Sequence, residues 1–86
     1  MTWDYHPMVA WEESDDDGYF VTNATRGGIV SLSDNAAAMW ELLPGRTTAE
    51  LTDAVAELYT VEASEIADDV AAFLSDLARQ GLAVDA

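Results

Sequence analysis

Residues 28–33 read Gly-Ile-Val-Ser-Leu-Ser and lead directly into residues 34–43, Asp-Asn-Ala-Ala-Ala-Met-Trp-Glu-Leu-Leu. The first segment is rich in strand formers and alternates in side-chain size, which is typical of a short β-strand. The second segment carries apolar residues three and four positions apart, which is typical of an amphipathic helix. A turn residue precedes the strand, and a Pro-Gly pair follows the helix. This stretch therefore predicts a strand that runs straight into the first of several helices.

Two further helices are expected downstream. Residues 47–50, Thr-Thr-Ala-Glu, place Thr and Glu three apart, which is the spacing of a capping box at a helix start. The apolar stripe of this second helix consists of Leu51, Val55, Leu58 and Tyr59. The third helix has the longest stripe, made of Ile66, Val70, Phe73, Leu74 and Leu77. Gly81 follows and is expected to act as its C-terminal cap.

Upstream, residues 8–12 and 19–24 are also rich in strand formers. The acidic segment 12–18 between them ends in Asp-Gly, which favours a hairpin loop. Consecutive strands joined by short loops usually form an antiparallel meander, so the first and third strands become the sheet edges. The order is β-β-β-α-α-α, and the fold class is α+β and winged-helix-like, with the helices covering one face of the sheet. We expect a loose N-terminus over residues 1–7 and a single domain over residues 8–86.

The charge balance is the strongest compositional feature. Seventeen Asp and Glu residues stand against three arginines and no lysine, for a formal net charge of −14. Binding to nucleic acid draws much of its affinity from phosphate neutralisation by Lys and Arg, and anionic membranes are disfavoured for the same reason. A small winged-helix DNA-binding protein thus remains only as an unfavoured alternative. The acidity either attracts a basic partner or serves solubility.

The sequence offers little for catalysis or metal binding. It contains no cysteine and a single histidine, His6, in the N-terminal segment. Neither a nucleophilic triad nor a metal site of histidine or thiolate ligands can be built from it, and the acidic run does not match a calcium loop. We therefore expect no enzyme activity, no metal and no cofactor. No apolar run resembles a signal peptide or a membrane span, so a cytoplasmic setting is expected.

Several of these residues, taken together in order, resemble the PqqD-like family of precursor-peptide recognition elements. They are residues 28–33 at the third strand, Trp40-Glu41-Leu42-Leu43, Gly45-Arg46-Thr47, Glu50-Leu51, Asp69-Val70, Phe73-Leu74, Leu77 and Gly81-Leu82. The resemblance covers about residues 8–84. Ser33 stands where the family often has Asn, and both residue types can begin a helix.

The resemblance implies that the chain binds the leader segment of a ribosomally synthesised precursor peptide. The leader is expected to add a strand to the third strand, at Gly28, Ile29, Val30, Ser31 and Leu32. On the third helix, the expected groove residues are Asp69, Val70, Phe73, Asp76 and Leu77. Acidic groups beside an apolar groove suit a basic leader. A purely structural interpretation remains open, in which Val30, Leu32, Val70 and Leu77 are core and both aspartates are a solvated helix face.

Two pathways within the family remain open at this point. The favoured one is lasso-peptide biosynthesis, in which the chain works with a separate leader-cleaving cysteine protease and a maturation enzyme. The alternative is a peptide chaperone of pyrroloquinoline quinone biosynthesis that serves a radical S-adenosylmethionine enzyme. Neither nucleic acid nor membrane is an expected partner.

Overall fold

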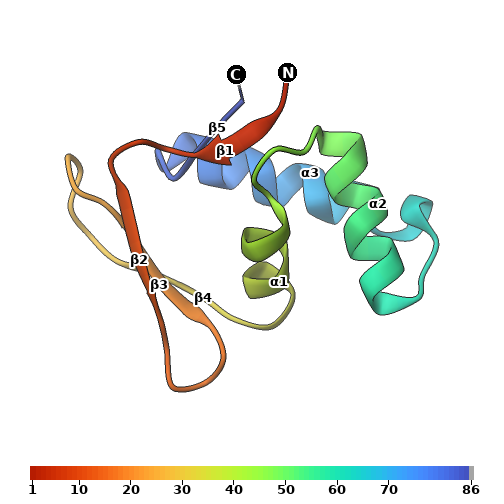
Figure 1. Cartoon of the computed structure of the whole chain (residues 1–86), viewed down its shortest axis with the longest axis horizontal. Helices are drawn as coiled ribbons and strands as arrows, with labels where there is room; N and C mark the ends of the chain where they lie inside the picture. Colours follow the sequence, from red (N-terminus) through yellow and green to blue (C-terminus); the bar gives the residue numbers. More distant parts are fainter. Residues whose placement is uncertain (86) are drawn as a thin grey trace.

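The computed structural model describes residues 1–85 and contains three helices and five strands (Figure 1). In chain order they are β1 (Trp3–Tyr5), β2 (Val9–Glu13), β3 (Tyr19–Asn23), β4 (Val30–Leu32), α1 (Asp34–Leu42), α2 (Thr48–Tyr59), α3 (Ala63–Arg79) and β5 (Ala83–Asp85). The predicted α+β order is confirmed, with two short strands added at the two ends of the chain. Within residues 1–85, none of the helices has the length and apolar character needed to cross a membrane.

The main sheet is the predicted antiparallel meander, in the order β2-β3-β4. Its hairpin closes through the acidic loop, where the Ser14 N–H donates to the Gly18 carbonyl at 2.9 Å. Gly18 also brings the loop close to β4, because a Cβ at this position would lie 2.2 Å from the Leu32 carbonyl oxygen. A side chain here would push β4 away from β3, which explains glycine at this position.

The N-terminal residues are more ordered than the sequence suggested. The expectation of a loose segment is wrong for residues 3–5, which form β1 and pair with β5 in an antiparallel ladder. Trp3 is buried, and its indole N–H donates to Thr48 Oγ1 at 3.0 Å. The strand has only three residues and its partner lies at the other end of the chain, so no local pattern announces it.

The helix ends follow their sequence signals with one exception. The capping box at α2 is confirmed, since Thr47 Oγ1 accepts from the Glu50 N–H at 3.1 Å and the Glu50 carboxylate accepts from the Thr47 N–H at 2.9 Å. Gly81, with φ +72°, follows α3 in the left-handed conformation expected of a C-terminal cap. At α1, Ser33 is the N-cap residue, but its side chain makes no capping hydrogen bond.

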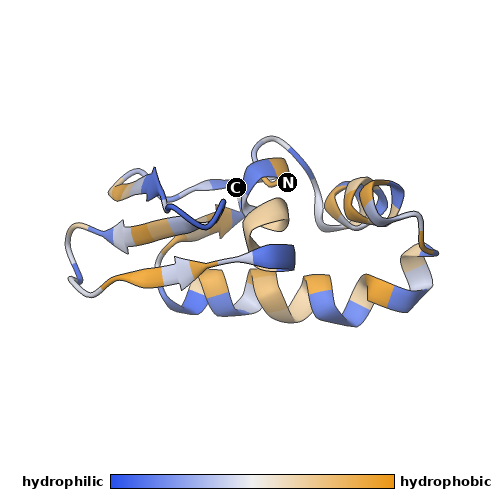
Figure 2. Cartoon of the chain, turned by 90° about the horizontal axis from the view of Figure 1, so that it is seen from below, coloured by the Kyte–Doolittle hydropathy of each residue, from blue (hydrophilic) through white to orange (hydrophobic). Residues whose placement is uncertain are grey.

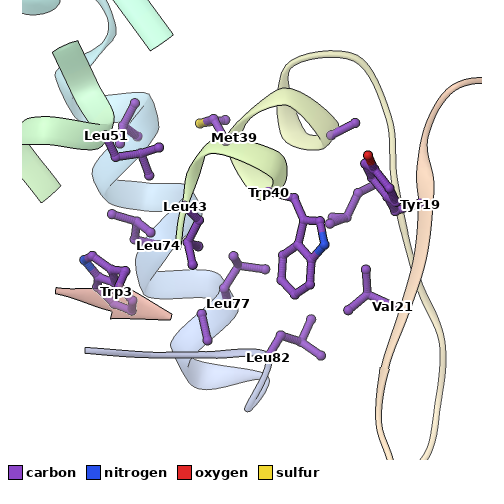
Figure 3. Close-up of a cluster of buried hydrophobic side chains, with 14 of the residues drawn as sticks. Trp3, Tyr19, Val21, Met39, Trp40, Leu43, Leu51, Leu74, Leu77 and Leu82 are labelled. Atoms are coloured by element: carbon purple, nitrogen blue, oxygen red, sulfur yellow. The ribbon is translucent and has the colours of Figure 1, made fainter. Parts of the chain in front are cut away.

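The core lies between the inner face of the main sheet, the three helices and the small β1-β5 sheet (Figure 3). Trp40 of α1 is fully buried at its centre, and the Tyr5 ring stacks on it at 4.3 Å between ring centroids. Trp11 reaches the same cluster from β2, with its ring 4.5 Å from Tyr5 and 5.7 Å from Trp40. These aromatic contacts fasten the sheet to α1.

A polar contact also joins the sheet to α1. The Tyr19 hydroxyl of β3 donates a hydrogen bond to the carboxylate of Glu41 in α1. This hydrogen bond, together with burial, raises the pKa of Tyr19 to about 12. The phenol therefore stays protonated, and the contact stays intact, throughout the neutral range.

The predicted stripe of α2 is only half buried. Leu51 and Val55 lie in the core, as expected, but Leu58 is 57% exposed and Tyr59 is 42% exposed. The core covers the early turns of α2, and the last turn extends beyond it. Helical periodicity correctly identified the face of α2 that packs on the core. It could not show how many turns of that face the core covers.

Candidate functional site

β4 is an edge of the main sheet, bonded to β3 on one side only. In Figure 2 it forms the border of the sheet that lies toward α3. The sequence Val-Ser-Leu carries no charge and no proline, the two devices that most often keep an edge strand from pairing with another chain. The strand therefore presents backbone groups that a peptide can bond.

The register identifies which backbone groups face outward. The Ala24 N–H donates to the Met8 carbonyl at 2.9 Å, which fixes which backbone groups of the hairpin face each other. Because successive residues of a strand direct their N–H and C=O to opposite sides, the even-numbered residues of β3 bond β2 and the odd-numbered residues bond β4. The odd-numbered residues are opposite the first and last residues of β4. The N–H and C=O of the central residue, Ser31, must then point to the open edge. Its side chain is exposed as well.

An apolar pocket of about 200 Å³ opens near the carboxyl end of β4. Its walls come from the start of α1, the end of α2 and the first half of α3. The lining residues are Asn35, Met39, Val55, Tyr59, Val61, Ile66, Asp69 and Val70. Because Asn35 follows β4 by only three residues, a strand added along β4 would end beside this pocket. The arrangement pairs a row of backbone groups with a recess for a side chain.

The predicted site residues fall into three groups by burial. Gly28, Ile29, Ser31 and Asp69 are exposed; Val30, Phe73 and Asp76 are half-buried; Leu32, Val70 and Leu77 are buried. The three buried residues belong to the core cluster, and Val30 and Phe73 pack against that cluster from outside. Of the predicted groove, the structure places only Asp69 and Val70 in the wall of the pocket.

The two predicted aspartates have different surroundings. Asp69 lies at the pocket with its side chain exposed, where it can meet a cation on an entering peptide. Asp76 is bonded to two neighbours on its own helix, since its carboxylate accepts from the Arg79 guanidinium and from Gln80 Nε2, the latter at 3.0 Å. Asp69 is thus the better placed of the two to attract a basic ligand.

Each of the three arginines contacts its own chain. Arg26 donates to the Arg79 carbonyl at 2.8 Å, Arg46 donates to the Leu42 carbonyl, and the Arg79 side chain pairs with Asp76. They come from three different segments, Arg26 contacts the backbone at Arg79, and the sequence has no lysine to add to them. Three engaged arginines on a chain of net charge −14 argue against the DNA-binding alternative.

Sequence reasoning missed most of the pocket. Met39, Tyr59 and Ile66 lie on the apolar stripes predicted for the three helices, and Asn35 is one of the residues predicted as a possible cap of the first helix. Val61 has no predicted role. The one local signal was Val61, an exposed apolar residue in the connector between α2 and α3. The other lining residues became recognisable only when the ends of three helices were brought together.

An open, uncharged edge strand beside an apolar pocket defines a class of peptide-binding module, in which an extended peptide completes the sheet. Residues 18–83 match the family model described as coenzyme PQQ synthesis protein D (PqqD). The chain belongs to the PqqD family. No curated protein matches the sequence.

Two solved structures share the fold over almost the whole chain. One is lasso peptide synthetase B1 complexed with the leader peptide, with a TM-score of 0.80 and 23% identity, covering 99% of this chain and 100% of that one. The other is TbiB1 in complex with the TbiA(beta) leader peptide, with a TM-score of 0.82 and 24% identity, covering 100% of this chain and 98% of that one. At this level of identity, the likeness establishes the common fold.

Proposed function

We propose that the chain binds the leader segment of a ribosomally synthesised precursor peptide and delivers it to the enzymes that mature a lasso peptide. The leader lies as an added strand along β4, and one of its apolar side chains enters the pocket between the three helices. Two solved structures of the same fold support this proposal, because both hold leader peptides.

The observation that carries the proposal is the position of the pocket at the end of an open edge. A short strand on its own gives little selectivity, since backbone hydrogen bonds form with any extended peptide. An apolar anchor in a recess supplies selectivity, and a few such anchors usually provide most of the binding energy. Here the pocket begins at Asn35, shortly after Ser31 in the chain.

The negative charge of the chain favours leaders that carry positive charge. A leader with Lys or Arg beside its apolar anchor would be attracted by Asp69 and by the overall charge of −14. Such attraction raises the association rate and falls with added salt. The proposed partner is therefore a basic leader.

In this proposal the chain is a binding protein and takes no part in the chemistry. It works in the cytoplasm, and cleavage belongs to a separate leader-cleaving cysteine protease, after which a maturation enzyme closes the product. The predicted edge residues 28–32 and Phe73 are included in the proposed site as the edge and flank of the leader strand. Val70 and Asp69 are included as the wall of the anchor pocket.

A second candidate function has one observation in its favour. The matching family model is described as coenzyme PQQ synthesis protein D. The chain would then present a precursor peptide to a radical S-adenosylmethionine enzyme of pyrroloquinoline quinone synthesis. The mode of strand addition would be the same, and only the peptide and the receiving enzyme would differ.

The test is fluorescence anisotropy of a labelled leader peptide from the precursor encoded beside this gene, titrated with the protein at low and high salt. We expect saturable binding of about micromolar strength or better, near −8 kcal/mol, that weakens at high salt. A pyrroloquinoline quinone precursor peptide serves as the second probe. Tighter binding of that probe would favour the second candidate, and no binding of either peptide would refute strand-addition binding of these ligands.

A further inference from the structure

The outer face of the main sheet is defined by Ala10, Glu12, Phe20, Thr22 and Ile29. Of these residues, only Ile29 belongs to the proposed leader site, where it borders the β4 edge. Register places Glu12 and Ser31 on either side of Phe20, and Thr22 opposite Ala10. Side chains of directly opposed residues share a face, and their neighbours in sequence, such as Val21, point to the core. In Figure 1 the helices lie on the other side of this sheet.

This face exposes two large apolar side chains to solvent. Phe20 is 42% exposed and Ile29 is 75% exposed. The side chains of the outer sheet face surround a shallow hollow of about 210 Å³, which Trp11 and Val21 also line. An exposed aromatic and an exposed isoleucine around one hollow are typical of a protein-binding surface.

Acidic residues border the apolar centre on one side. Glu12 lines the hollow itself, Glu13 ends β2 beside it, and the three aspartates of residues 15–17 follow in the exposed loop at the same end of the sheet. An apolar centre with an acidic border complements a surface that is apolar at its centre and basic at its rim.

The same charges disfavour a second copy of this chain as the occupant. A symmetric contact through the outer sheet face would bring two acidic loops and two chains of net charge −14 together. Like charges across an interface cost binding energy, and nothing basic on this face offsets them. The occupant is therefore a different protein.

The face is also continuous with the proposed leader site. Ile29 directly precedes β4, and Ser31 of β4 is opposite Phe20. A leader strand added to β4 would extend the sheet beyond this edge while leaving the Ala10, Phe20 and Thr22 side uncovered. A protein bound on the outer sheet face would then have the leader within reach.

We infer that the outer sheet face is the docking surface for the enzyme that receives the leader, through a contact patch that is apolar at its centre and basic at its rim. This inference rests on the proposed function. It assigns leader binding and enzyme docking to two adjacent surfaces, the β4 edge and the outer sheet face.

The test uses the purified leader peptidase encoded beside the precursor gene, whose binding to the protein is measured by biolayer interferometry. Phe20→Ser is the main variant and Ala10→Glu the second, in case the first reduces folding as seen by circular dichroism. Leu58→Ser is the control, because Leu58 is a comparably exposed apolar residue outside both surfaces. Leader affinity is measured in parallel by anisotropy.

We expect Phe20→Ser and Ala10→Glu to weaken peptidase binding by about tenfold or more, while leader affinity changes by less than about twofold. Leu58→Ser should leave both unchanged, and Glu12→Gln should reduce the salt dependence of peptidase binding. Unchanged peptidase binding in both face variants, or no binding by the native chain, would overturn the inference. A matching loss of leader affinity would instead assign the face to the leader. A native dimer that Phe20→Ser dissociates would assign it to a second copy.

If the native chain binds the peptidase but not the leader, the proposed function fails and the docking surface stands. If it binds the leader normally while both face variants bind the peptidase normally, the docking surface fails and the proposed function stands. The two ideas are therefore separable in one set of measurements.

Discussion

β1 and β4 are both three-residue strands, but they differ in whether backbone hydrogen bonds are made on both of their sides. β1 pairs with β5 on one side, and on the other side Trp3 exchanges backbone hydrogen bonds with the loop after α1. The Trp3 N–H donates to the Arg46 carbonyl at 2.7 Å, and the Gly45 N–H donates to the Trp3 carbonyl at 2.9 Å. β4 is bonded on one side only. The fold thus bonds β1 on both sides at Trp3 and leaves β4 open on one side.

This contrast shows that the open edge is particular to β4, since the same fold provides backbone hydrogen-bond partners on both sides of Trp3 in β1. The other free edge of the main sheet, β2, carries Glu12 and Glu13, and charged side chains discourage pairing with another chain. β4 has no such protection except its shortness. Of the two free edges, only β4 combines uncharged residues with a neighbouring pocket, and this combination is what the proposed function requires.

The largest expected effect concerns the closed strand. Trp3→Ala should destabilise the fold by about 3–5 kcal/mol, because it removes a buried aromatic side chain and leaves a cavity. That is a large share of the ~5–15 kcal/mol typical of a whole domain. Urea unfolding followed by circular dichroism measures the change. Thr48→Ala, which removes only the acceptor of the indole hydrogen bond, should cost much less. Equal stability of Trp3→Ala and the native chain would mean that β1 contributes nothing to the fold.

The next effect concerns the open strand. Ser31→Pro should weaken leader binding by about tenfold or more, at least ~1.4 kcal/mol, because it removes the N–H that points to the edge. Stability should change little, since proline is tolerated where the N–H does not bond the sheet. Ser31→Ala keeps the amide and is the matched control. Anisotropy and urea unfolding on both variants give the comparison. A Ser31→Pro chain that is folded and binds normally would exclude β4 as the docking edge.

The pocket should matter more through its apolar walls than through its charge. Ile66→Ala removes part of the wall, and we expect a fall in leader affinity of roughly tenfold from lost apolar contact. Asp69→Asn should cost only about two- to threefold, because an exposed charge is screened by water and salt. Leader titrations at low and high salt separate the two. If Asp69→Asn has the larger effect at high salt, the anchor is not apolar.

The smallest expected effect concerns the contact between the sheet and α1. The Glu41 hydrogen bond and burial raise the pKa of Tyr19 to about 12, above its ordinary value of 10.0. Because the folded state holds this proton more tightly than the unfolded chain, its contribution to stability is complete below pH 10 and is lost as pH rises toward 12. Glu41→Gln should lower the pKa of Tyr19, as followed by tyrosinate absorbance. An unchanged titration would show that the carboxylate does not hold the phenol.

Much of the fold was predictable because its signals are local. The alternation over residues 28–33, the Thr47 and Glu50 capping box and the glycine after the third helix each act over a few residues. The capping box and the glycine are confirmed, and the strand is confirmed for Val30–Leu32 only. The family and its fold could also be inferred, since the ordered series of core, cap and turn residues is distributed along nearly the whole chain. The loose N-terminus was wrong for residues 3–5, which pair with a strand at the other end of the chain. For the same reason the stripe of α2 could not show how far along the helix the core extends.

The sequence by itself determined the element types, the edge position of the third predicted strand and the acidic charge that disfavours nucleic acid. Only the tertiary structure decided that Trp3 is buried beside Thr48, that Ser31 is the residue whose backbone faces outward, and that a pocket forms at the end of β4. The physical reason is the same in each case. Periodicity and capping report on neighbours along the chain, whereas a pocket and a closed or open edge depend on which segments, remote in sequence, meet in space.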